Sequence, residues 1–323
     1  MPDTTRVLVM APFKPHHMER LHDAAAGRAT LTQVPGRLMS EDELRPLLSQ
    51  SDVVIGEPAP TLLAEGTPVR WVQMTWAGSD LYTQGEIPFP EGTRLTNVAG
   101  AAFGHIISQF VVGQILSLAQ DFPLYVRQQE RELWAWAGPV TSLEGAMVLI
   151  FGAGDIGSFT AKRLSGFDCH CVGVCRDTSA TRPHFERLVT LDEAEAELPR
   201  ANVVVNCLPN TPETAHWLDE RRLRLMREGS ILVNVGRGNF IDCYALARVL
   251  AEGRLRGAAL DVCDPEPLPQ GHPLWHETRC FITPHTAGGS FGKCAATEQR
   301  ICDICCENLD RWLNGRELTH VVI

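Results

Sequence analysis

The first 168 residues of this 323-residue chain contain no cysteine, and all eleven cysteines follow from Cys169 onward. A small secreted domain held by disulfides distributes its cysteines over the whole fold, so a disulfide scaffold is not indicated. The opening Met1-Pro-Asp-Thr-Thr-Arg leads directly into a strand-like segment, without the apolar stretch of a signal peptide. We therefore expect reduced thiols in a cytoplasmic protein.

The most closely spaced cysteines are Cys302, Cys305 and Cys306, within a helical stretch. A structural metal site needs about four ligands, and no second pair of ligand residues stands nearby in the sequence. We expect these thiols to be buried on a helix, as free cysteines commonly are, and we predict no metal site.

The chain has fewer basic than acidic residues, 29 Lys and Arg against 39 Asp and Glu, and its isoelectric point is near 5.6. A net negative field repels polyanions, which argues against a nucleic-acid or anionic-membrane partner. The one basic run, Arg221–Arg227, is typical of the solvated face of a helix that begins at Asp219. Apolar residues at 44% exclude long disordered tracts.

Residues 101–119 contain no charged side chain and are almost long enough to span a bilayer. The segment nevertheless includes His105, Ser108, Gln109 and Gln114, and no second segment of this kind exists. A helix that is apolar on most sides is more often buried between domains or subunits. We expect a buried interface helix here, not a membrane span.

Short apolar runs alternate with helix-compatible stretches along the chain, which predicts parallel sheets covered by helices. The length, divided by about 150 residues per domain, indicates two such units. The strands expected in the first hundred residues are Arg6–Met10, Ala29–Val34, Asp52–Ile55, Trp71–Met74 and Arg94–Asn97. The later strands expected are Met147–Phe151, Cys169–Cys175, Asn202–Cys207, Ser230–Val235, Arg256–Asp261 and Cys280–Ile282. The helices expected include Ser40–Ser49, Pro123–Trp134, Asp155–Leu164, Tyr244–Ala251 and Ser290–Asn314.

A Gly-x-Gly-x-x-Gly pattern stands between the predicted strand Met147–Phe151 and the helix that follows it. Its glycines are Gly152, Gly154 and Gly157. The first permits a tight turn, the second lets a pyrophosphate approach the backbone, and the third lets helix and strand pack closely. The N–H groups of Asp155 and Ile156, at the start of the helix, would then face the phosphates of a dinucleotide.

The next strand ends at Cys175, followed by Arg176 and Asp177. An acid at this point binds the ribose 2′-hydroxyl of NAD, whereas an arginine accommodates the 2′-phosphate of NADP. A neutral residue beside a guanidinium favours the phosphate, although Asp177 could neutralise Arg176. We predict that NADP is preferred and that NAD remains possible.

Three further predicted strands are followed by polar loops that contain Arg237, Glu266 and His285, respectively. Each residue alone has an ordinary structural explanation, as a turn arginine, a solvated acid or a hydrogen-bonded loop histidine. Ligands of parallel sheets bind beyond the carboxyl ends of the strands, so the three loops can converge on one crevice.

Together these segments resemble the D-isomer-specific 2-hydroxyacid dehydrogenases, and within them most closely the glyoxylate/hydroxypyruvate reductase branch. Three other segments share the resemblance: Met74-Thr-Trp-Ala-Gly-Ser-Asp80, Thr96-Asn-Val-Ala-Gly100 and Leu208-Pro-Asn-Thr-Pro-Glu-Thr214. The resemblance implies a Rossmann nucleotide-binding domain and a flavodoxin-like substrate domain with a cleft between them. The substrate domain would be discontinuous, residues 1–100 and 288–323, with the nucleotide domain at 101–287 and a homodimer formed through the latter.

The resemblance also implies roles for single residues. Arg237, Glu266 and His285 would be the catalytic set, and Trp76, Ala77, Gly78 and Arg237 would contact the substrate. Further cofactor contacts are implied at Leu208, Pro209, Thr214, Val235, Gly236, Asp261 and Gly288, with Asp261 positioning the nicotinamide amide.

The chemistry of a 2-keto acid suits these residue types. Reduction adds a hydride to the carbonyl carbon and a proton to its oxygen, and imidazole is the side-chain group that exchanges protons near neutral pH. The carboxylate of Glu266 would favour the protonated ring of His285. The planar fork of Arg237 suits a carboxylate and a polarised carbonyl.

Two departures from the family pattern bear on the prediction. Ser108-Gln109 replaces the usual Ala-Glu in the long helix, which could alter dimer or hinge contacts. Trp76 is bulky and either packs in the fold or lines the substrate pocket, which leaves the substrate size open.

The sequence thus predicts an oxidoreductase that reduces a small 2-keto acid, such as glyoxylate or hydroxypyruvate, to the D-2-hydroxy acid with NAD(P)H. A broader reductase for larger apolar 2-keto acids is one alternative. A dinucleotide-sensing binding protein, like the corepressors of the same fold, is another.

Overall fold

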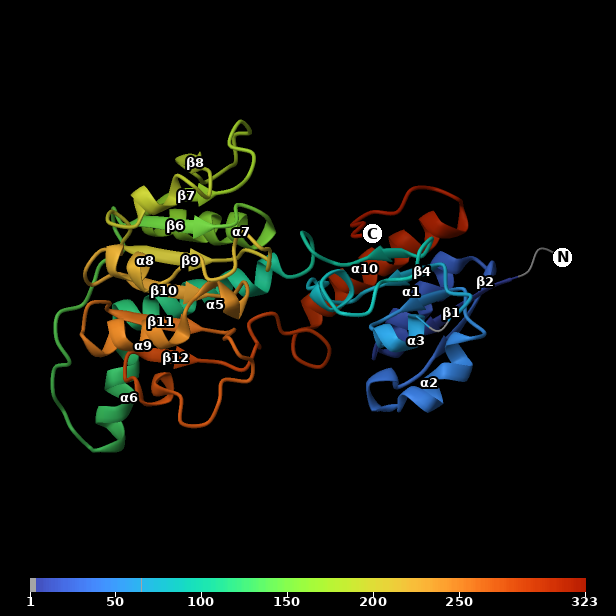
Figure 1. The fold of residues 1–323 in the computed structure, drawn as a ribbon, viewed down its shortest axis with the longest axis horizontal. Coiled ribbons are helices and arrows are strands. Elements are labelled where there is room, and N and C mark those ends of the chain that lie inside the picture. Colours follow the sequence, from blue (N-terminus) through green and yellow to red (C-terminus); the bar gives the residue numbers. More distant parts are fainter. Residues whose placement is uncertain (1–3, 65) are drawn as a thin grey trace. The chain divides into compact units, whose positions relative to one another are not determined.

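The computed structural model describes residues 4–64 and 66–323, which form two compact units (Figure 1). The first unit combines the chain up to Phe103 with Gly289–Ile323, and the second is Gly104–Gly288. The boundaries expected from the sequence were 100 and 288. Each unit has its own apolar core and is described by itself.

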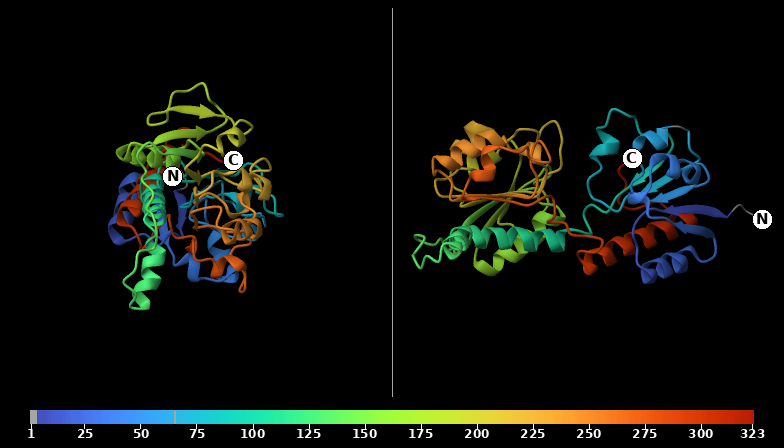
Figure 2. Two further views of the ribbon diagram at one scale, coloured as in Figure 1. Left: turned by 90° about the vertical axis from the view of Figure 1, so that its left-hand side faces the viewer. Right: turned by 90° about the horizontal axis from the view of Figure 1, so that it is seen from below.

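The first unit contains a five-stranded parallel sheet in the order β2-β1-β3-β4-β5, the flavodoxin-like order. Its strands are β1 Thr5–Val9, β2 Ala29–Gln33, β3 Val53–Ile55, β4 Trp71–Gln73 and β5 Arg94–Thr96. Its helices are α1 Pro15–Ala25, α2 Glu41–Leu48, α3 Pro60–Ala64, α4 Asp80–Thr83, the 3₁₀ turn η1 Gly36–Leu38 and α10 Ala295–Leu313. Figure 2 shows that α10 returns from the end of the chain to lie beside α1. The first unit is therefore built from two separate stretches of the chain.

The second unit contains a seven-stranded parallel sheet, ordered β12-β11-β10-β9-β6-β7-β8 (Figure 1). Its strands are β6 Met147–Phe151, β7 His170–Val174, β8 Arg187–Val189, β9 Val203–Asn206, β10 Ile231–Asn234, β11 Gly257–Leu260 and β12 Cys280–Ile282. Its α-helices are α5 Gly104–Ala119, α6 Phe122–Glu130, α7 Asp155–Leu164, α8 Glu220–Leu225 and α9 Cys243–Ala251. Its 3₁₀ turns are η2 Ser165–Phe167, η3 Ala194–Glu197, η4 Gly238–Phe240 and η5 Pro273–His276. Strands β7 and β8 are added on one side of β6, and strands β9 to β12 on the other side. Doubly wound sheets bind dinucleotides at the point where the strand order reverses in this way, here between β6 and β9.

Helix α5 covers this sheet and corresponds to the uncharged segment of the sequence. It packs against α7 and β10, and the Oγ of Ser108 donates hydrogen bonds inside the helix to the carbonyls of Gly104 (2.5 Å) and His105 (3.2 Å). Among the described residues, no helix is long and apolar enough to cross a membrane.

Several helix ends follow local capping chemistry. Ser40 and Glu43 form the reciprocal capping box of α2, and the carboxylate of Asp219 accepts the N–H of Arg222 at the start of α8. Helix α6, however, ends at Glu130 and not at Trp134. Glu132 adopts a left-handed φ of +54°, and the N–H of Leu133 returns to the carbonyl of Gln128 (2.9 Å), which closes the helix.

Candidate active site

The glycine-rich turn between β6 and α7 requires glycine at two positions. Gly152 adopts φ +97°, a conformation that other residues rarely take. A Cβ at Gly157 would lie 1.9 Å from the carbonyl oxygen of Gly152, so the helix passes directly over the turn. These constraints fix the position of the start of α7.

The start of α7 is open to a ligand. Gly154 is the N-cap of α7 and supplies no side-chain cap, and a Cβ built on it would meet nothing within 4 Å. Asp155 and Ile156 are the first residues of this helix, where N–H groups have no partner within the helix and the helix dipole is positive. The carboxylate of Asp155 turns aside to accept the N–H of Gly104 (2.8 Å). These features fit the pyrophosphate of a dinucleotide.

Beyond β7, Arg176 is exposed, and no ion pair of this arginine is found within the described ranges. The carboxylate of its neighbour Asp177 is turned toward Ser179 and accepts hydrogen bonds from the Oγ (2.6 Å) and N–H (3.0 Å) of that residue. These bonds lower the pKa of Asp177. The thiol of Cys175 donates to the carbonyl of Asp177 (3.1 Å). The charge of Arg176 helps to lower the pKa of the Glu213 carboxyl, so this exposed guanidinium also lies in the field of an acid.

The sequence analysis missed Arg182, in the same loop. Its Nη1 donates to the carbonyl of Ala153 within the glycine turn (2.7 Å). Its Nε is buried and has no hydrogen-bond partner among the described atoms. A buried guanidinium nitrogen without an acceptor fits a site that receives an anion. The only sequence signal was a second basic residue after the strand, and nothing in the sequence linked it to Ala153.

Asn206 and Asn234, which end β9 and β10, join the loops that follow these strands. The Nδ2 of Asn206 donates to the Oδ1 of Asn234 (2.9 Å), and the Oδ1 of Asn206 accepts the N–H of Leu208 (3.1 Å). The Oγ1 of Thr214 closes its loop on the carbonyl of Pro209 (2.9 Å). Leu208 and Pro209 are thus held beside the glycine turn, where the resemblance places cofactor contacts.

The loop after β10 carries Val235, Gly236 and Arg237. Val235 and Gly236 are buried, and a Cβ at Gly236 would lie 2.5 Å from the carbonyl oxygen of Leu208. Arg237 is half-buried; its carbonyl accepts the Nδ2 of Asn234 (3.0 Å), and its Nη1 donates to the carbonyl of Gly236 (2.9 Å). The backbone at Arg237 is therefore held by its neighbours.

The loops after β11 and β12 bring an acid and a histidine into contact. Oε1 of Glu266 lies 2.7 Å from Nδ1 of His285, and both side chains are about half exposed. They line a cavity of about 490 Å³ that also contacts Asp261 and Trp275. Arg237, on the adjacent strand end, lies outside the wall of this cavity.

Asp261 holds the backbone that presents His285. Its buried carboxylate accepts the Oγ1 of Thr283 (2.6 Å) and the N–H groups of Thr286 (2.8 Å) and Ala287 (3.0 Å). Its carbonyl accepts the N–H of His285 (2.9 Å). His285 itself adopts a left-handed φ of +52°, a strained conformation that surrounding bonds must maintain. Asp261 therefore holds the backbone on which His285 is placed. Gly288, after this loop, is the last residue of the unit.

In the first unit, Trp76, Ala77 and Gly78 form the turn after β4. The Oε1 of Glu57 accepts the N–H (2.6 Å) and Oγ1 (2.9 Å) of Thr75, and the Nδ2 of Asn97 donates to the carbonyl of Ala77 (2.8 Å). Within the described part of the chain, the N–H groups of Ala77 and Gly78 have no hydrogen-bond partner. The turn therefore retains two donors for a ligand.

Trp76 is not buried in the core of the first unit. Its side chain is 44% exposed, and the guanidinium of Arg37 lies 4.7 Å from the centre of its ring. The interpretation as simple packing is therefore not favoured, and the exposed ring leaves Trp76 available to line a substrate site.

The clustered cysteines lie on α10. The thiols of Cys302 and Cys306 are 3.8 Å apart, and Cys302 and Cys305 are buried. Over residues 4–64 and 66–323, no group of three or more His, Cys, Asp or Glu side chains could hold a metal ion.

Comparison with known proteins shows similarity to one family of dehydrogenases, which agrees with the geometry of the site. The sequence model of the D-isomer specific 2-hydroxyacid dehydrogenase NAD-binding domain matches residues 112–287. An uncharacterised protein of Streptomyces coelicolor is 34% identical over 77% of this chain and 88% of its own length. A glyoxylate reductase of Thermofilum pendens is 31% identical over 71% of this chain and 69% of its own length. A structure of a D-isomer specific 2-hydroxyacid dehydrogenase family protein from Aeromonas salmonicida has a TM-score of 0.86 and 30% identity, with 99% of each chain covered.

The two parallel sheets, the glycine turn and the family match agree with one another. The chain belongs to the D-isomer specific 2-hydroxyacid dehydrogenase family and is a dehydrogenase that interconverts 2-hydroxy and 2-keto acids with a nicotinamide dinucleotide.

Proposed function

We propose that this enzyme reduces a small 2-keto acid, glyoxylate or hydroxypyruvate, to its D-2-hydroxy acid. The observation that carries the proposal is the 2.7 Å contact between Glu266 and His285 in an open cavity. A relative that covers most of this chain is named glyoxylate reductase. The dinucleotide supplies the hydride; the residues of the chain bind the acid and move the proton.

His285 is the proton donor in this proposal. Its Nδ1 is engaged by Glu266, so Nε2 is the ring nitrogen that remains to face the carbonyl oxygen of the substrate. The carboxylate orients the ring and stabilises its charged form. Arg237 binds the substrate carboxylate and polarises the carbonyl, since its fork reaches two oxygens at once. The N–H groups of Ala77 and Gly78 bind the other carboxylate oxygen.

We further propose that NADPH is preferred over NADH. Arg176, which is exposed, supplies the charge for the 2′-phosphate, and the carboxylate of Asp177 is turned toward Ser179. Leu208, Pro209 and Thr214 cover the adenosine side, while Val235, Gly236, Asp261 and Gly288 border the rest of the dinucleotide.

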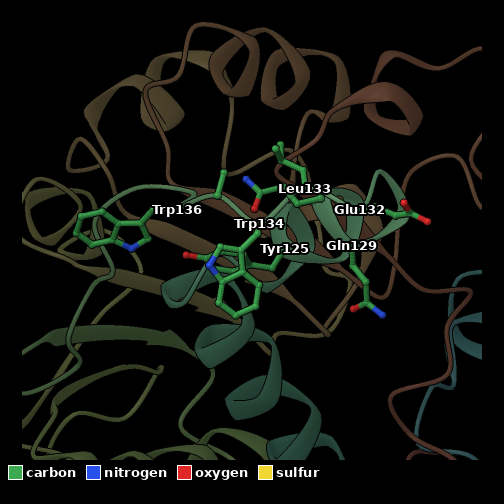
Figure 3. A pocket seen from close by; sticks show the side chains of 8 residues that line it. Tyr125, Gln129, Glu132, Leu133, Trp134 and Trp136 are labelled. Carbon is green, nitrogen blue, oxygen red and sulfur yellow. The ribbon is translucent and has the colours of Figure 1, made fainter.

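A homodimer formed through the nucleotide-binding unit is also proposed. Helix α6 and the segment after it expose large apolar side chains, including Trp134 (102% exposed) and Trp136 (81%). These two rings and Tyr125 line a hollow of about 780 Å³. Figure 3 shows the three side chains from close by. An apolar surface of this kind is typical of a subunit interface. Light scattering of the wild type should give twice the mass of one chain, and the double variant Trp134→Ser, Trp136→Ser should give a lower mass. A wild type with the mass of one chain would contradict the proposal.

The deciding experiment is a substrate panel with purified enzyme. Reduction of glyoxylate, hydroxypyruvate, pyruvate and phenylpyruvate is followed by the absorbance of NADPH and of NADH. The proposal expects the highest kcat/KM for the two small acids with NADPH. A maximum at phenylpyruvate would favour the broad reductase, and tight cofactor binding without any turnover would favour a corepressor-like sensor.

A further inference from the structure

Arg37 is an exposed arginine of the first unit, and its guanidinium lies over the indole ring of Trp76. The Cζ of Arg37 is 4.7 Å from the centre of the ring, a distance typical of a cation–π contact. Within residues 4–64 and 66–323, the guanidinium makes no hydrogen bond, and no acid lies within ion-pair distance of it. A guanidinium that contacts a ring through its face keeps its N–H donors at its edge. The donors of Arg37 therefore point away from the ring and are not used by the fold.

The backbone that carries Arg37 is fixed by close packing at the end of β2. Arg37 belongs to the turn η1, and a Cβ on the preceding Gly36 would lie 2.6 Å from the Cβ of Met10, directly after β1. Gln33, the last residue of β2, donates through its Nε2 to two carbonyls of the loop after β1 (3.1 and 2.9 Å). The turn is therefore held against the end of β1, which limits where Arg37 can begin.

The contact between Arg37 and Trp76 lies at the edge of the sheet where this topology binds ligands. Arg37 follows β2 and Trp76 follows β4, so both lie beyond the carboxyl ends of parallel strands. Strands β1 and β3 stand between β2 and β4 in the sheet. Sheets of this order bind ligands between β1 and β3, where the strand order reverses. The side chain of Arg37 therefore spans the expected ligand position to reach Trp76.

One acid, Glu57 after β3, lies in the field of Arg37. The Oε1 of Glu57 accepts the N–H (2.6 Å) and the Oγ1 (2.9 Å) of Thr75, which holds the backbone before Trp76. Burial raises the pKa of Glu57, while the bonds from Thr75 and the charge of Arg37 act against this rise. A hydroxyl suits such surroundings better than a second carboxylate, because it accepts a hydrogen bond from the cation and is not repelled by the acid.

Trp76 adjoins the two donors that the proposed function assigns to the substrate carboxylate. These are the N–H groups of Ala77 and Gly78, which have no partner among the described residues. In a three-carbon 2-keto acid, only the carbonyl carbon separates the carboxylate from the third carbon. A substrate whose carboxylate is bound by these N–H groups therefore carries its third carbon close to Trp76 and Arg37.

We propose that Arg37 and Trp76 form a subsite for the third carbon of the substrate, and that this subsite selects a hydroxyl group. The ring of Trp76 is a flat apolar wall for the carbon, and Arg37 donates a hydrogen bond to the hydroxyl oxygen. Hydroxypyruvate and larger 2-keto acids with a 3-hydroxyl are then preferred to pyruvate, whose third carbon is a methyl group. This inference rests on the proposed function, because it takes the carboxylate to be bound at Ala77 and Gly78.

Arg37→Met tests the subsite, because methionine keeps an apolar chain beside Trp76 and removes every donor. Arg70→Met is the matched control. Arg70 also lies over an indole ring, that of Trp312 (5.6 Å), but it precedes β4 and so belongs to the opposite, amino-terminal edge of the sheet. Melting temperatures show whether each full-length variant is folded.

Two properties are measured for the wild type and both variants. The first is kcat/KM for hydroxypyruvate, pyruvate and oxaloacetate, of which the last carries a second carboxylate. The second is the dissociation constant of D-glycerate and of D-lactate, the corresponding 2-hydroxy acids of the first two, measured by calorimetry with the oxidised dinucleotide bound. The binding constants do not require turnover.

The wild type should prefer hydroxypyruvate to pyruvate, and D-glycerate to D-lactate, by about tenfold, the effect of one hydrogen bond to a charged group. Arg37→Met should lose most of both preferences, and Arg70→Met should keep them. Equal affinity of the wild type for the two hydroxy acids would overturn the proposal, as would a preference that Arg37→Met retains or that Arg70→Met loses to the same extent. A higher kcat/KM for oxaloacetate than for hydroxypyruvate would overturn the choice of a hydroxyl. If no keto acid is reduced, the proposed function fails, and the binding constants still decide for or against the subsite.

Discussion

Glu266 and His285 follow adjacent parallel strands, and their side chains meet at 2.7 Å between Oε1 and Nδ1. The strand order places them together, because β11 and β12 are neighbours whose carboxyl ends share one edge of the sheet. Asp261, on the first of these loops, holds the backbone of the second. The donor pair therefore depends on bonds outside the pair itself.

Replacement of His285 by alanine should lower the rate of keto-acid reduction about 10²–10⁴-fold, the usual contribution of a positioned general acid. Dinucleotide binding should persist, because the glycine turn is on other strands. His276→Ala, which removes an exposed histidine of the same unit, is the control and should retain activity. A loss below tenfold in His285→Ala would mean that another group protonates the substrate oxygen.

Replacement of His285 should also change how the reduction rate depends on pH, because the group that delivers the proton to the substrate oxygen is removed. Steady-state kcat with saturating dinucleotide, measured from about pH 5 to pH 10 for the wild type and His285→Ala, tests this. Profiles of the same shape in the two enzymes would contradict the assignment of the donor.

Much of the fold could be predicted, because buried parallel strands are short apolar runs and glycines mark the turns. The predicted helix Asp155–Leu164 and strand Cys280–Ile282 have the observed bounds. The end of α6 could not be predicted, since Glu132 takes a left-handed conformation without the usual glycine. Strand β8 (Arg187–Val189) was missed, because an edge strand that is only partly buried has no continuous apolar run.

The site was predictable only in part. The family resemblance indicated Glu266 and His285, and their contact is observed, although their catalytic role stays a prediction. The bond from Arg182 to Ala153 is a tertiary contact between two loops, and no local pattern encodes it. The same holds for the carboxylate of Asp261, whose partners lie more than twenty residues away in the sequence.

Arg176→Ala and Arg182→Ala should have different effects on cofactor use. A hydrogen bond to a charged group contributes about 1.5–3 kcal/mol, so Arg176→Ala should lower kcat/KM for NADPH about 10- to 100-fold and leave NADH nearly unchanged. Arg182 holds the carbonyl of Ala153 in the turn that both dinucleotides share, so its loss should weaken both. Kinetics with the two dinucleotides test this. A preference unaffected by Arg176→Ala would contradict the NADP assignment.

The ion pairs of Glu195 should stabilise the folded state at neutral pH, and this stabilisation should be lost in strong acid. Its hydrogen bonds from Arg221 (2.7 and 2.6 Å), and then from Arg222 (2.8 Å), lower the pKa of Glu195 to about 2. An acid whose pKa is depressed in the folded state contributes stability above its unfolded value, about 4.3, and loses it as the pH falls through the folded value. Glu195→Gln should melt at a lower temperature than the wild type at pH 7, and the difference should shrink toward pH 2. Glu144→Gln, at an exposed site, should show no such trend.

Asp261→Asn should loosen the loop that presents His285. An asparagine has one oxygen where the two carboxylate oxygens now accept three donors, so its amide would face a backbone N–H of Thr286 or Ala287. An unsatisfied buried donor costs about 1–3 kcal/mol, and because His285 is held at φ +52° by this network, activity should fall together with stability. Thr283→Val is the graded control, since it removes only the 2.6 Å hydroxyl bond and should cost about 1 kcal/mol. Hydrogen exchange of the amides at 283–287, measured beside kcat, should rise more in Asp261→Asn than in Thr283→Val. Equal exchange in the two variants would show that the carboxylate does not hold this loop.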